Sequence, residues 1–271
     1  MFNDYTQKAI EVAKDAGKIL REGFGSSFTI TNKEGKNNLV TDYDRRSEEL
    51  IIESLSKSFP DTIFLAEESG LSRQWNNDTP IWIIDPLDGT VNFAHNLPIF
   101  SVSIALSIDN KIVSGVIYHP ILNELFVAEK GKGSFLNGLK LKVSNCRSLD
   151  DSFLVTGFPY NIDANPSHCV EQFVQILKKG IPVRRLGSAA LDLAYVAAGI
   201  FDGFWEINLN PWDVAAGFLL VEEAGGKVTQ YNGDPYWITN NNILATNGLI
   251  HDELSQTLIS CYLEITNANR S

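Results

Sequence analysis

Two aspartates follow a short apolar run and are spaced to act together. In the stretch IWIIDPLDG, residues 81–84 are apolar, and Asp85 and Asp88 come next. The apolar run predicts a short buried strand, and Gly89 allows a sharp turn, so both carboxylates can face one point at the end of that strand. Like charges repel there unless one is protonated or a cation lies between them. Oxygen ligands without His or Cys suit Mg²⁺ better than Zn²⁺, although a solvated turn explains DPLDG alone equally well.

Acidic residues elsewhere in the chain could complete such a site. Glu67 and Glu68 end a second strand-like run in FLAEESG, a pattern that solvated surface also produces. Asp213, in NPWDVAAG, is expected to be the N-cap of a helix that begins at Val214, and this role is compatible with metal binding. The backbone amides after the first turn, together with the hydroxyl of Thr90, can present hydrogen-bond donors to an anion. These features favour a cation site that also receives an anion such as phosphate.

The composition argues against several classes of protein. A net charge of −11, from 33 acidic and 22 basic residues, disfavours nucleic acid as the main partner. Three cysteines without a C-x-x-C pair argue against a disulfide framework and a zinc knuckle. The N-terminal stretch does not resemble a signal peptide, and no apolar stretch approaches the roughly 18–20 residues that span a bilayer. We therefore expect a cytoplasmic protein without a membrane partner.

The elements that must position these residues fall into two halves. Apolar residues at helical spacing predict amphipathic helices over about 5–20 and 50–59. Residues 63–144 then read mostly as strands of an antiparallel meander, and after residue 149 strands alternate with helices. The prediction is an α+β half, residues 1–147, followed by an α/β half, residues 148–271.

The longer sequence around these acidic residues resembles a known family. DPLDGTVNF, followed much later by PWDVAAG and EEAGG, is similar to the two signature motifs of the inositol monophosphatase family, and LVTDYD, AEES and RRLGSAALDLAYVAAG extend the likeness over nearly the whole chain. The resemblance implies a single unit over residues 1–271. It implies a layered α-β-α-β-α sandwich of the inositol monophosphatase / fructose-1,6-bisphosphatase type, α+β and α/β in class. It also implies a homodimeric, lithium-sensitive and Mg²⁺-dependent phosphomonoesterase.

The resemblance assigns roles to individual residues. Two Mg²⁺ ions are implied, one held by Glu67, Asp85 and the Leu87 carbonyl and one by Asp85, Asp88 and Asp213, while a third, weaker ion would share Glu67. Many relatives carry aspartate where this chain has Asn38, which puts the third ion and the strength of lithium inhibition in doubt. Thr90 would position and deprotonate the attacking water with Glu67 or Asp44. The implied substrate contacts are Asp88, Gly89, Thr90, Arg184, Ala189, Glu206 and Asp213.

Hydrolysis of a small phosphomonoester, with inositol-1-phosphate as the best substrate, is the function that the sequence favours. Enzymes of the same fold that act on fructose-1,6-bisphosphate, NADP or a 3′-phosphoadenosine nucleotide are the alternatives within the enzyme class. A regulatory partner that keeps an unused site is the alternative outside it. The retained acidic set argues against that alternative, because unused like charges are costly to bury.

Overall fold

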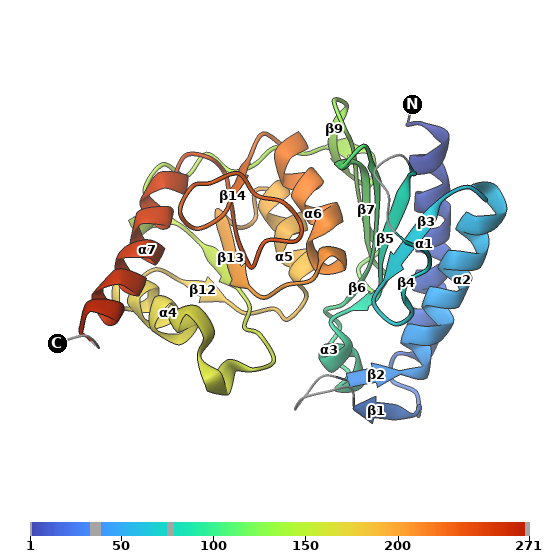
Figure 1. Cartoon of the computed structure of the whole chain (residues 1–271), viewed down its shortest axis with the longest axis horizontal. Coiled ribbons are helices and arrows are strands. Elements are labelled where there is room, and N and C mark those ends of the chain that lie inside the picture. The colour runs from blue at the N-terminus through green and yellow to red at the C-terminus, as the bar shows by residue number, and fades with distance from the viewer. Residues whose placement is uncertain (1, 33–38, 75–78, 269–271) are drawn as a thin grey trace.

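The chain folds into alternating layers of helix and sheet (Figure 1). The computed structural model describes residues 2–32, 39–74 and 79–268. An eight-stranded sheet and a five-stranded sheet lie on either side of a central helical layer, and further helices cover the outer face of each sheet. This arrangement confirms the predicted α-β-α-β-α sandwich. The outer layers are α1 (Asp4–Gly23) with α2 (Asp42–Ser58) and α4 (Cys169–Lys178) with α7 (His251–Ala268), and the central layer is α5 (Ala189–Ala197) with α6 (Pro211–Glu223).

The larger sheet is almost entirely antiparallel, with the order β10-β9-β8-β7-β6-β5-β3-β4. Its exception is the parallel pairing of β3 with β5, in which Ala66 lies opposite Ile84. Its strands are β3 (Ile63–Ala66), β4 (Gly70–Leu71), β5 (Ile81–Asp88), β6 (Ser101–Ile108), β7 (Lys111–His119), β8 (Glu124–Glu129), β9 (Gly133–Leu136) and β10 (Leu139–Lys140). A separate pair, β1 (Ile30–Asn32) with β2 (Leu39–Thr41), precedes α2, and the short helix α3 (Thr90–Ala94) follows β5.

The smaller sheet mixes parallel and antiparallel pairs, in the order β12-β11-β13-β15-β14. The strand β11 is parallel to both of its neighbours, β12 and β13, whereas β15 is antiparallel to β13 and β14. These strands are β11 (Leu154–Thr156), β12 (Val183–Arg184), β13 (Gly203–Ile207), β14 (Lys227–Thr229) and β15 (Asn242–Thr246). Three 3₁₀ turns, η1 (Leu149–Asp151), η2 (Ile162–Ala164) and η3 (Pro166–His168), lie in its connections.

Burial on both sides explains the composition of the central helices. Every residue from Val214 to Val221 of α6 is buried, because the larger sheet covers one side of this helix and α5 with the smaller sheet covers the other. A helix that is apolar all round is expected only in such a position. The helix also packs closely on β7, where a Cβ added to Gly115 would lie 2.8 Å from the Ala216 carbonyl oxygen. Among the helices that the structure describes, none is long and apolar enough to cross a membrane.

Two predicted element boundaries are wrong at the residues that matter most. The strand predicted over 81–84 continues to Asp88. The helix predicted to begin at Val214 begins at Pro211, because proline suits the first helical position, where no backbone N–H is needed. Asn210 is the N-cap of this helix, so Asp213 is not the N-cap but the third residue of the first turn.

Candidate active site

Parallel pairing of β3 with β5 brings Glu67 and Asp85 to the same edge of the larger sheet. The Glu67 amide donates a hydrogen bond to the Ile84 carbonyl at 3.2 Å, and the Leu87 amide donates one to Asp85 Oδ1 at 3.0 Å. Residues three apart in a regular strand point to opposite faces, but the pairing of β5 with β6 shifts register between Asp85 and Asp88. Such an irregularity re-aims side chains.

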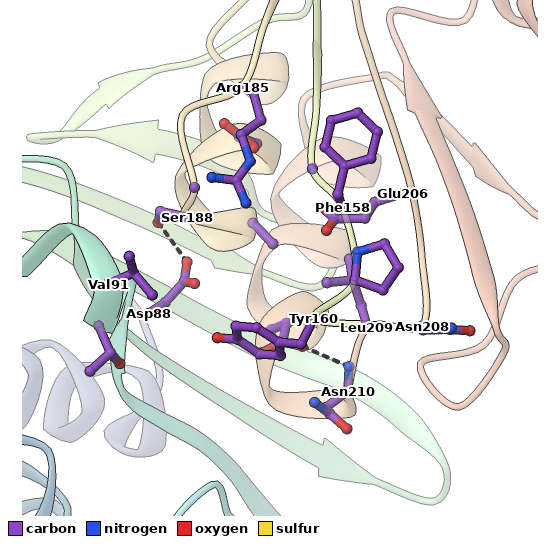
Figure 2. Close-up of a pocket in the computed structure, with 18 of the residues that line it drawn as sticks. Asp88, Val91, Phe158, Tyr160, Arg185, Ser188, Glu206, Asn208, Leu209 and Asn210 are labelled. Carbon is purple, nitrogen blue, oxygen red and sulfur yellow. Dashed lines mark hydrogen bonds between the residues drawn. The ribbon is translucent and has the colours of Figure 1, made fainter. Parts of the chain in front are cut away.

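The Asp88 carboxylate lies at the N-terminus of α5. Its Oδ2 accepts hydrogen bonds from the Ser188 hydroxyl at 2.6 Å and from the Ala190 amide at 2.8 Å, and Figure 2 shows the first of these on one side of the pocket. Burial raises the pKa of Asp88 to about 6, although these hydrogen bonds oppose the shift. A helix N-terminus stabilises negative charge, so α5 fixes the orientation of this carboxylate.

Asp213 is oriented by the first turn of α6. Its Oδ2 accepts a hydrogen bond from the Asn210 amide at 2.7 Å, which forms one half of a capping box. Sequence reasoning assigned Asp213 a capping role, and the structure moves that role from the N-cap to the third helical residue. The helix start therefore holds the carboxylate at the cavity instead of leaving it in solvent.

Four carboxyl groups lie near enough to perturb one another. Burial is the main cause that raises the pKa of Asp85, and the neighbouring charges of Glu67, Asp88 and Asp213 raise it further. Burial also raises the pKa of Asp213, with Glu67 and Asp88 adding to the effect. Among the side chains that the structure describes, no three acidic, His or Cys groups already converge as a metal cluster. The donors are all oxygen and mutually repulsive, so their chemistry fits a hard divalent cation such as Mg²⁺.

A buried hydrogen-bond network connects Thr90 to Asp44. The Thr90 hydroxyl lies 3.0 Å from Asp44 Oδ1 and 3.0 Å from the Leu87 carbonyl oxygen, and it can donate to either. The other carboxylate oxygen of Asp44 accepts from the amide and the hydroxyl of Thr41, at 2.8 and 2.5 Å. Burial raises the pKa of Asp44 to about 6. This raised pKa makes Asp44 a better proton acceptor than an exposed aspartate.

A cavity of about 540 Å³ opens beside these groups (Figure 2). Asp88 lies on one side of it, and Glu206 lies beside Phe158 on another. Of the predicted site residues, Asp44, Asp85 and Leu87 are buried and are not among those that line it. The predicted residues that line it are Glu67, Asp88, Gly89, Thr90, Ala189, Glu206 and Asp213.

Arg184, a predicted substrate contact, is not among the residues that line the cavity. The exposed Arg184 side chain stacks over the Phe153 ring at 4.9 Å from its centroid, whereas Arg185 lines the cavity. Residues next to each other in an extended segment point in opposite directions, so only one arginine of the pair can face inward. The charge of Arg185 opposes the rise in pKa that burial causes at Glu206 and Asp192.

Sequence reasoning missed further residues of the cavity. Asp192 lines it, is 1% exposed, and its Oδ1 has no hydrogen-bond partner among the described atoms. Tyr160 and Gly157 line it from the segment after β11. Asp192 belongs to the stretch RRLGSAALDLAYVAAG. Helical spacing from Ala189 is the sequence pattern that could have placed it on a helix beside the site. Asn38, with its bearing on a third ion, lies outside the described residues.

Comparisons with known proteins match this chain to one family by its sequence and by its fold. The model of the inositol monophosphatase family matches residues 3–264. An inositol-1-monophosphatase from Synechocystis sp. is 46% identical over 255 residues, which cover 92% of this chain and 87% of that protein. The Nus factor SuhB of Escherichia coli is 41% identical over 259 residues, covering 92% of this chain and 97% of that protein. The crystal structure of extragenic suppressor protein SuhB from Bartonella henselae is 41% identical, with a TM-score of 0.89, and the match covers 94% of this chain and 98% of that one.

A layered sandwich with carboxylates at the ends of its strands and beside a polar cavity fits the class of phosphomonoesterases. The chain belongs to the inositol monophosphatase family, because the family model matches nearly its whole length. Members of this family act on small phosphomonoesters and generally depend on Mg²⁺.

Proposed function

We propose that the protein hydrolyses inositol-1-phosphate to inositol and phosphate with Mg²⁺ as its cofactor. The observation that carries this proposal is the composition of one cavity. Three carboxylates of the implied metal site line it together with Glu206, the residue that the family resemblance assigns to substrate hydroxyls. The inositol-1-monophosphatase of Synechocystis, 46% identical to this chain, supports the choice of substrate.

The carboxylate cluster is the proposed holder of the cation. Glu67, Asp85 and the Leu87 carbonyl would hold one Mg²⁺, and Asp85, Asp88 and Asp213 would hold another. When bound, the ions supply Lewis-acid stabilisation to the phosphate and to the leaving oxygen. The amides of Gly89 and Thr90 would donate hydrogen bonds to the phosphate oxygens.

The Thr90 and Asp44 pair handles the proton of the attacking water. When the Thr90 hydroxyl donates to Asp44 instead of to the Leu87 carbonyl, its oxygen can accept a hydrogen bond from a water molecule and orient it. As the water attacks, its proton passes to Thr90 while the Thr90 proton passes to Asp44. The buried position of Asp44, with its raised pKa, favours this uptake of a proton.

Phosphate release from a panel of substrates tests the proposal. The panel contains inositol-1-phosphate, fructose-1,6-bisphosphate, NADP and a 3′-phosphoadenosine nucleotide, each assayed with Mg²⁺. We expect the highest kcat/KM for inositol-1-phosphate. A higher value for another member would contradict the proposed substrate and keep the phosphatase, whereas no release from any member would contradict both.

The second candidate function is a regulatory partner, and one observation favours it. The Escherichia coli relative at 41% identity is named a Nus factor. The chain keeps Glu67, Asp85, Asp88, Thr90 and Asp213 around the site, so the phosphatase remains the better-supported proposal. Absence of phosphate release from the whole panel is the result that would favour the regulatory function.

The arginine pair provides a prediction with a built-in control. Arg185→Ala should raise KM for inositol-1-phosphate by about tenfold, because it removes the basic group that faces the cavity and leaves Glu206 without a neighbouring cation. Arg184→Ala should change KM by less than about twofold, since its side chain stacks on Phe153. Steady-state kinetics of both variants check the prediction. Equal effects of the two substitutions would contradict the assignment of Arg185.

A further inference from the structure

Gly157 and Glu206 are neighbours across two paired strands. Thr156 of β11 lies opposite Trp205 of β13, and the Thr156 hydroxyl donates a hydrogen bond to the Trp205 carbonyl at 2.6 Å. The next residues along the chain are therefore Gly157, directly after β11, and Glu206, within β13. Both line the cavity.

The Glu206 carboxyl group occupies the space that a side chain at residue 157 would need. A Cβ added to Gly157 would overlap all three carboxyl atoms of Glu206, Cδ and both oxygens. The backbone does not require glycine here, because φ of Gly157 lies outside the left-handed region. Glycine at residue 157 therefore leaves the space that the Glu206 carboxyl group occupies.

If residue 157 carried a side chain, we expect the Glu206 side chain to move and the backbone of β11 to stay in place. The strand β11 is paired on both of its edges, with β12 and with β13, so its end is held in the sheet. Glu206 is 7% exposed. A packed interior offers few voids. A Glu206 carboxyl group that is pushed away from residue 157 would therefore move into the cavity.

We propose that Gly157 is a specificity-determining position, whose lack of a side chain sets where the Glu206 carboxyl group meets the hydroxyl groups of the substrate. The proposal rests on the proposed function for its substrate, a polyol monophosphate. Gly157 acts as a positioning residue through Glu206 and has no part in the metal site.

A double-mutant cycle tests this coupling on two substrates. Gly157→Ala should raise KM for inositol-1-phosphate by about tenfold, the scale of one hydrogen bond to a charged group. Its kcat/KM for p-nitrophenyl phosphate, which has no hydroxyl groups for Glu206, should stay within about twofold of the parent value. Glu206→Asp should impair the polyol phosphate similarly. The double variant G157A/E206D should bind it better than G157A alone, because the shorter side chain withdraws from the added methyl group.

Two results would overturn the proposal. One is an unchanged KM for inositol-1-phosphate in Gly157→Ala, and the other is strictly additive losses in G157A/E206D. If Gly157→Ala folds poorly, thermal unfolding replaces kinetics: the added substitution Glu206→Ala must then recover Tm, and a Tm that it leaves unchanged also overturns the proposal. Unfolding needs no substrate, so failure of the wild-type protein to hydrolyse inositol-1-phosphate would refute the proposed function separately.

Discussion

Replacing Asp88 by asparagine is expected to lower kcat/KM for inositol-1-phosphate by on the order of 10²–10³. The substitution keeps the size of the side chain and removes one negative charge from the group that would hold the cation. Catalysis by a positioned metal depends on that charge, because it fixes the ion against the phosphate. Steady-state kinetics in saturating Mg²⁺ measure the loss.

The folded state should survive this substitution. The Ser188 hydroxyl can donate to the oxygen of the new amide as it does to Asp88. The substitution also removes one buried negative charge that lies near other carboxylates. Tm in EDTA should therefore be unchanged or higher. A variant that unfolds at ordinary temperature, or that keeps near-normal activity with Mg²⁺, would contradict the shared-metal role.

Asp213→Asn is the matched companion of this variant. The asparagine oxygen can still accept from the Asn210 amide, and Asn210 remains the N-cap, so α6 should keep its start. We expect a loss of activity of similar size without loss of the helix. Asp150→Asn, at an exposed residue of η1 that does not line the cavity, removes the same charge and should leave kcat/KM unchanged.

Chelation is expected to abolish activity, and added Mg²⁺ is expected to restore it. The carboxylates that surround the site raise one another's pKa, and they need a cation for all to be ionised together. Phosphate release in excess EDTA, before and after Mg²⁺ is returned, measures this dependence. Full activity in excess EDTA would contradict the proposed mechanism.

Stability provides a readout of the same cation without substrate. Binding to the folded state stabilises it by about 2.7 kcal/mol when free Mg²⁺ is 100 times its Kd, so Tm should rise by several degrees. Asp88→Asn should show a smaller rise. An equal rise in the wild-type protein and in the variant would place the cation elsewhere.

Local patterns were enough to predict much of the architecture. Alternating apolar residues and turn signals predicted most strands of the larger sheet. Helical spacing predicted α1 and the second half of α2, which begins at Asp42 and not near residue 50. Boundaries at the site were predicted less well. Asp88 belongs to β5 because an irregular pairing with β6 extends the strand, and such pairing depends on a partner strand that local sequence does not specify.

The sequence by itself determined which residue types carry the chemistry. The apolar run before DPLDG predicted that a rigid strand holds Asp85 and Asp88 in place, and β5 includes both residues. The motifs indicated the family to which the family model assigns residues 3–264. Residue types did not decide which of two adjacent arginines faces the cavity, because that choice depends on the direction of the chain as it leaves β12.

Only the tertiary structure decided how distant residues meet. Parallel pairing of β3 with β5 places Glu67 beside Asp85, and the layer packing brings α6 with Asp213 to the same cavity. The crowding of Gly157 against Glu206 likewise arises from the register of β11 on β13. The physical reason is common to all three cases: strand register and layer packing are set by contacts between segments far apart in the chain, and no local pattern of spacing encodes those contacts.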